Sequence, residues 1–69
     1  MGTITLTRRE KEIADLLVME LTNKEIADRL GIAIRTVDNH VASLIVKCHA
    51  KTRTGVVAEV LREQVGKTT

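Results

Sequence analysis

The sequence predicts an all-α domain of four helices, and three observations support this fold class. The chain has 69 residues, which is enough for one domain at most. It has no proline and no aromatic residue, and its 43% of hydrophobic residues are mainly aliphatic, a mixture that favours helices over strands. Apolar residues recur at helical spacing in four successive segments.

The first helix is expected to begin after Thr7. Thr7 and Glu10 have the spacing of a capping box, in which the hydroxyl and the carboxylate each bind a free backbone amide. Apolar residues at 13, 16, 17 and 21 then form one buried helix face. A second capping box, formed by Thr22 and Glu25, starts another helix almost at once. The two helices must therefore meet through a tight turn.

The second and third helices have the pattern of a helix-turn-helix. Such a unit needs a small residue where its helices approach and a turn residue that adopts positive φ, and Ala27 and Gly31 supply them. The inner face of the third helix, about residues 34–48, covers an arc of roughly 100° and consists of Ile34, Val37, Val41, Leu44, Ile45 and Cys48. The predicted unit runs from about Asn23 to about Cys48.

The fourth helix follows a polar break at residues 51–53, with Thr52 or Thr54 as its N-cap. Its apolar residues spread over roughly 200° of the helix, which is wider than one core contact needs. We expect some of them to face a second subunit, with an upstream domain as the alternative: Val56, Val57, Val60, Leu61 and Val65. The domain is predicted at residues 6–66, between a flexible arm at 1–5 and a flexible tail at 67–69.

Positive charge is concentrated on the third helix and the break after it. The whole chain carries only +2, but residues 35–53 have four basic side chains and one acidic one, while residues 1–34 carry a net −1. This distribution favours a nucleic-acid partner for the helix-turn-helix.

Several motifs in this order resemble the LuxR-type (GerE-type) DNA-binding family over about residues 6–64. They are Leu6-Thr7-x-Arg9-Glu10, Asn23-Lys24-Glu25-Ile26-Ala27, Leu30-Gly31-Ile32, Arg35-Thr36-Val37-x-Asn39-His40 and Lys47. The resemblance implies a three-helix core plus a C-terminal dimerisation helix. It also implies a transcriptional regulator that binds double-stranded DNA as a homodimer, with the third helix in the major groove.

The resemblance also implies which residues meet DNA. Asp38, Asn39 and Ala42 occupy the positions that most often meet bases; Asn39 could pair with adenine and Ala42 could touch a thymine methyl group. A plain solvated helix surface is the alternative for each of them. Ser43 projects from the same outward face, and the candidates for phosphate contact are Lys24, Arg35, Thr36, Lys47 and Arg53. For Lys24 and Lys47 the alternative is an ordinary solubilising lysine.

Four residues depart from the family pattern. Asp38 stands where a basic residue is usual, and a carboxylate repels phosphate although it accepts from a cytosine amino group. Ala33 stands where Ser or Thr usually caps the third helix, and Glu20 where glycine is common in a left-handed turn. Cys48 replaces a typical Leu, which is consistent with a small buried thiol rather than a reactive one.

We expect no enzymatic activity, cofactor, metal or small-molecule substrate. The only group that suggests catalysis or metal binding consists of Cys48, His49 and His40. Cys48 and His49 are adjacent, so their side chains diverge on a helix. The sequence has no secretory signal and no membrane-spanning apolar run, so a cytoplasmic location is expected. The alternative function is a helical protein-interaction module of the same fold with weak or lost DNA binding.

Overall fold

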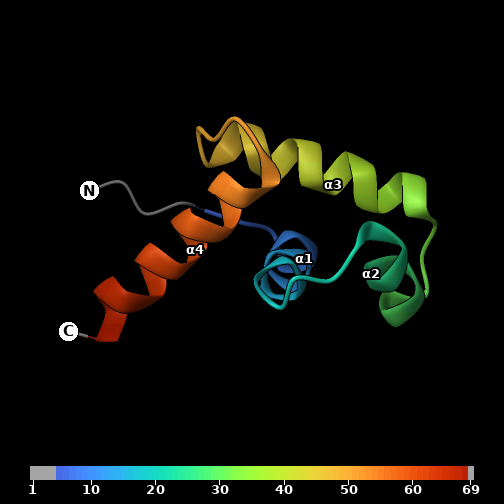
Figure 1. The fold of residues 1–69 in the computed structure, drawn as a ribbon, viewed down its shortest axis with the longest axis horizontal. Helices are drawn as coiled ribbons and strands as arrows, with labels where there is room; N and C mark the ends of the chain where they lie inside the picture. The colour runs from blue at the N-terminus through green and yellow to red at the C-terminus, as the bar shows by residue number, and fades with distance from the viewer. Residues whose placement is uncertain (1–4, 69) are drawn as a thin grey trace.

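The computed structural model describes residues 5–68, with side chains as far as residue 63. It contains α1 (Arg8–Val18), α2 (Asn23–Leu30), α3 (Ile34–Lys47) and α4 (Arg53–Thr68), and these residues form no strand. In Figure 1, α1 is seen nearly end-on between α2 and α4, and α3 lies across them. The all-α fold class is confirmed. Along this described stretch, no helix is long and apolar enough to cross a membrane.

The predicted domain limits are close to the ends of the described chain. Helix α4 continues to Thr68, two residues past the expected limit at 66. Residues 1–4 of the expected arm and residue 69 of the expected tail lie outside the described residues.

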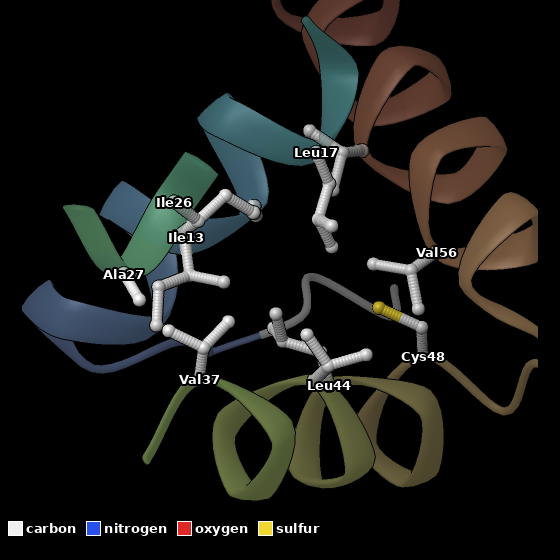
Figure 2. Close-up of a cluster of buried hydrophobic side chains, with 11 residues drawn as sticks. Ile13, Leu17, Ile26, Ala27, Val37, Leu44, Cys48 and Val56 are labelled. Atoms are coloured by element: carbon white, nitrogen blue, oxygen red, sulfur yellow. The ribbon is translucent and has the colours of Figure 1, made fainter. Parts of the chain in front are cut away.

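All four helices contribute to one core (Figure 2). Ile13, Ile26, Leu44 and Val56 come one from each helix, and all four are fully buried. Burial of an aliphatic side chain of this size contributes about 1.5–3 kcal/mol. Four of the six residues of the predicted inner face of α3 are buried, and Ile45 is partly buried against the core. Ile34 is 46% exposed because it is the first residue of the helix, at the edge of the packed face.

Both predicted capping boxes are present. At α1, the Thr7 amide donates to Glu10 Oε1 at 2.9 Å and the Glu10 amide donates to Thr7 Oγ1 at 3.1 Å. At α2, Thr22 and Glu25 make the same reciprocal pair at 2.7 and 3.1 Å. These bonds satisfy amides that have no partner within the helix, so they fix where each helix begins.

Left-handed residues end the first three helices. Gly31 has φ 69°, Glu20 has φ 63° and His49 has φ 55°. After α1, the Glu20 amide donates to the Leu17 carbonyl at 2.9 Å and the Leu21 amide to the Leu16 carbonyl at 3.4 Å, which is the bonding of a Schellman motif. The sequence predicted this conformation for Gly31. For Glu20 the family resemblance left two outcomes open, a changed turn or a strained left-handed residue, and the second is observed. Nothing in the sequence indicated it for His49.

Helix α4 begins directly after the turn that follows α3. The Gly55 amide donates to Thr52 Oγ1 at 3.4 Å. Of the two residues predicted as N-cap, Thr52 is therefore the one that caps α4. A Cβ at Gly55 would lie 2.9 Å from the Cβ of Ala50, too close for any side chain without a shift. Glycine therefore lets α4 start against this turn.

We expect Glu20→Gly to stabilise the fold by about 1 kcal/mol, because glycine adopts φ 63° without the steric penalty of a Cβ. Urea unfolding followed by far-UV circular dichroism measures the change, since the chain has no aromatic residue to report by fluorescence. Glu20→Ala is the matched control, because it removes the charge and keeps the Cβ. Equal stabilisation by both substitutions would show that the carboxylate, and not the backbone, was responsible.

Candidate nucleic-acid interface

Helices α2 and α3 form a helix-turn-helix. Helix α2 ends at Gly31, the Ile32 amide donates to the Ala27 carbonyl at 3.0 Å, and α3 begins at Ile34. Ala27 is only 2% exposed and lies near Val37 of α3 in the core (Figure 2). A small residue at this place lets the two helices approach closely. The opposite face of α3 is left open to solvent.

Five of the nine predicted DNA-binding residues lie on this open face. Their side chains are exposed: Arg35, Thr36, Asp38, Asn39 and Ala42. Val46, which is 73% exposed, extends the same surface toward the end of the helix. The N-cap Ala33 makes no side-chain hydrogen bond, as its residue type predicted. Because the N-cap supplies no side-chain acceptor, the partial positive charge at the start of α3 remains available to an anion.

Asp38 belongs to a chain of hydrogen bonds that joins three segments. Asn23 Nδ2, at the start of α2, donates to Asp38 Oδ1 at 2.7 Å. Asn23 Oδ1 accepts from Arg53 Nη1 at 2.7 Å, and Arg53 Nη2 donates to the Leu21 carbonyl at 2.9 Å. Arg53, a predicted phosphate contact, is therefore partly engaged inside the protein. No pattern in the sequence predicted this chain of bonds or the role of Asn23 in it.

Ser43 and Lys47 contact a buried carboxylate on α1. Glu10 is 5% exposed; its Oε1 accepts from Lys47 Nζ at 2.7 Å and its Oε2 accepts from Ser43 Oγ at 2.9 Å. The bond from Lys47, followed by that from the Thr7 amide, lowers the pKa of Glu10 from 4.5 to about 2, although burial acts in the opposite direction. Two predicted DNA-binding residues thus have an intramolecular partner. The sequence had assigned Glu10 only to the capping box.

Lys24 makes a weaker contact. Its Nζ lies 3.5 Å from Asp28 Oδ2, and both side chains are more than 70% exposed. Exposed pairs of this kind contribute about 0–1 kcal/mol. Lys24 can therefore exchange this partner for a phosphate group at little cost.

The residues predicted for a dimer interface divide into two groups. Val56 and Val60 are buried in the core of this chain, so the prediction that they contact a second subunit is wrong for a folded single chain. Val57 is half-buried and Leu61 is 43% exposed. Val57 and Leu61 line an open groove of about 760 Å³ between α4, the end of α1 and the turn that follows it. Val65 lies in the part of α4 whose side chains are outside the described residues.

Cys48 is a buried thiol at the end of α3. It is 7% exposed, and burial raises its pKa, with further contributions from Glu59 and Glu63. A thiol with a raised pKa is a poor nucleophile, as expected from the sequence. Among residues 5–63, no three His, Cys, Asp or Glu side chains are grouped so that they could hold a metal ion.

Comparison with known proteins identifies the family. Residues 4–60 match the GerE family, described as bacterial regulatory proteins of the luxR family. The chain is 46% identical over 57 residues to the spore germination protein GerE of Bacillus subtilis, covering 83% of this chain and 77% of that protein. A solved structure of the transcription factor GerE superimposes with a TM-score of 0.79 at 39% identity, covering 86% of this chain and 88% of the other.

Two longer regulators match over the same region. The tetrathionate response regulatory protein TtrR of Salmonella typhimurium is 40% identical over 83% of this chain. The transcriptional activator DevR/DosR of Mycobacterium tuberculosis is 45% identical over 71% of it. The aligned parts are 26% and 23% of those proteins, so this chain spans about a quarter of their length. With its four helices and its helix-turn-helix, the chain belongs to the luxR family of bacterial regulatory proteins.

Proposed function

We propose that this chain regulates transcription by binding duplex DNA with α3 in the major groove. The observation that carries the proposal is the open face of α3, which presents polar and small side chains on a helix whose other face is fixed in the core. A major groove about 12 Å wide admits one helix, which reads base edges with its outward residues. Membership of a family of bacterial regulators supports the same function, and the bacterial cytoplasm is the place where such a protein would meet DNA.

The predicted contact residues have different roles in this proposal. Asp38, Asn39 and Ala42 face the bases, while Arg35 and Thr36 at the start of α3 and Lys24 at the start of α2 contact phosphates. Lys47 and Arg53 reach the DNA backbone with the donors that their intramolecular bonds leave free. Ser43 has a single donor, which binds Glu10, so it reaches a phosphate only by exchanging that partner.

We propose a homodimer through α4. Among the described side chains of α4, Val57 and Leu61 are the large apolar ones that the core of one chain leaves accessible. A two-fold pair would cover the same side chains on both subunits and present two copies of α3 to two half-sites.

Salt dependence of DNA binding tests the proposal. Phosphate contacts release counterions, so the affinity for a labelled duplex should fall steeply between about 50 and 200 mM salt. Arg35→Ala and Lys24→Ala should each weaken binding about tenfold and reduce the slope of log affinity against log salt by about 0.9. Fluorescence anisotropy measures both quantities, and the stoichiometry should be two chains per duplex.

Lys11→Ala is the matched control, because Lys11 is an exposed lysine of α1 that pairs with Asp15 and lies outside the helix-turn-helix. It should bind as the unchanged protein does. If the unchanged protein bound no duplex even at low salt, or if all three variants bound alike, the protein-interaction module would become the better description.

A further inference from the structure

Asp38 is an acidic side chain on a surface that we propose binds DNA, and it is held in place from a second helix. We infer that Asp38 selects, at one position of the DNA site, a base that offers an amino group in the major groove, and that Asn23 positions it for this. The inference rests on the proposed function and concerns sequence preference within it.

The contacts of Asp38 fix one oxygen and leave the other available. Asn23 Nδ2 donates to Oδ1 at 2.7 Å, and Asn23 is in turn held by Arg53 Nη1 at 2.7 Å. Arg53 is anchored to the carbonyl of Leu21. In the described chain, Oδ2 of Asp38 has neither a hydrogen bond nor an ion pair, and the side chain is exposed. The carboxylate therefore presents an unpaired acceptor in a defined orientation.

The position of Asp38 directs that acceptor toward base edges. Asp38 is the fifth residue of α3, directly before Asn39, and the N-terminal part of a recognition helix is the part that contacts bases. An aspartate carboxylate accepts hydrogen bonds and donates none. In the major groove, cytosine N4 and adenine N6 are donors, whereas guanine O6 and N7 and thymine O4 are acceptors. A donor base satisfies Oδ2, and an acceptor base leaves two negative groups facing each other.

The contact with Asn23 makes Asp38 more than a source of repulsion. A free aspartate would turn away from the DNA and only lower affinity for every sequence. Asn23 opposes that rotation through a bond of 2.7 Å between side chains 15 residues apart. Discrimination between bases follows from this restraint, because Asp38 can turn away from an acceptor base only by breaking its bond with Asn23.

Selection from a random duplex pool tests the inference. The unchanged protein should enrich cytosine or adenine about tenfold over guanine and thymine at one position. Asp38→Ala should lose this preference, so that the four bases become about equally frequent at that position. Asn23→Ala, which keeps the Asp38 charge but releases it, should weaken the preference without removing DNA binding. Asp38→Asn retains an acceptor for Asn23 and should tolerate bases of both kinds.

Asp15→Ala is the control for loss of one exposed carboxylate, because Asp15 lies on α1 and pairs with Lys11. It should keep the preference of the unchanged protein, and circular dichroism confirms that each variant is folded. An identical preference in Asp38→Ala and the unchanged protein would overturn the inference and leave the proposed function standing. Absence of salt-dependent binding to any sequence would overturn the proposed function itself.

Discussion

Replacing Glu10 by alanine should lower the free energy of unfolding by roughly 2–4 kcal/mol. The substitution removes the acceptor for three donors at once, from Thr7, Ser43 and Lys47. It also breaks the capping box that starts α1, a loss of about 0.5–2 kcal/mol on its own. A domain of this length has a total stability of about 3–10 kcal/mol. The variant should therefore be partly unfolded at growth temperature.

Urea unfolding followed by circular dichroism at 222 nm measures the change, and two further variants locate its origin. Glu12→Ala removes an exposed carboxylate of the same helix that pairs with the exposed Arg9, and it should change stability by less than about 0.5 kcal/mol. Lys47→Met keeps the capping box and removes the cation, so it should cause part of the loss in free energy of unfolding that Glu10→Ala causes. Equal losses in Glu10→Ala and Glu12→Ala would contradict a structural role for the buried carboxylate.

Much of the fold could be predicted because its signals are local. Thr7 and Thr22 stand three residues before a Glu, and that spacing alone brings each pair together at a helix start. The strain at Glu20 was indicated by the family resemblance instead, because Glu20 stands where glycine is common in a left-handed turn. His49 shows the limit of local signals. It takes the same left-handed conformation, but its residue type does not distinguish it from an ordinary helix end.

The contacts that define the candidate site could not be predicted, because they join residues far apart in sequence. Glu10 meets Ser43 across 33 positions and Lys47 across 37, and helix spacing says nothing about which residue of α3 faces the start of α1. A helical wheel likewise places Val56 and Val60 on an apolar face of α4, but it does not show whether the core of the same chain or a partner packs against that face. Packing decides both questions, and packing depends on how the helices cross.

These contacts connect the stability of the fold to the face that we propose binds DNA. Glu10 holds the second half of α3 through Ser43 and Lys47, and Asn23 holds its first half through Asp38. Helix α3 is therefore positioned by polar contacts near both ends as well as by its buried side chains. A recognition helix needs this restraint, because its base contacts depend on a fixed register in the groove.

Acid should remove most of the stabilisation that Glu10 provides. Its pKa is about 2 in the folded protein against an ordinary value of 4.5, so the folded state favours the charged form. The contribution is therefore complete above about pH 4.5 and is lost as the pH falls toward 2. A difference of this size corresponds to about 3 kcal/mol, because each pKa unit is equivalent to about 1.4 kcal/mol. Urea unfolding at a series of pH values between about 6 and 2 measures the loss.

Glu10→Gln isolates this titration from that of the other carboxylates. Glutamine keeps an acceptor for the Thr7 amide but has no charge to lose, so the variant should be less stable than the unchanged protein above about pH 5 and nearly equal to it at about pH 2. Protonated Glu10 and the glutamine of the variant offer Lys47 the same thing, an uncharged oxygen in place of a carboxylate. If the two stability curves ran parallel through this range, the charge on Glu10 would not be what joins α1 to α3. The bonds from Thr7 and Ser43 would then have to do so as neutral hydrogen bonds.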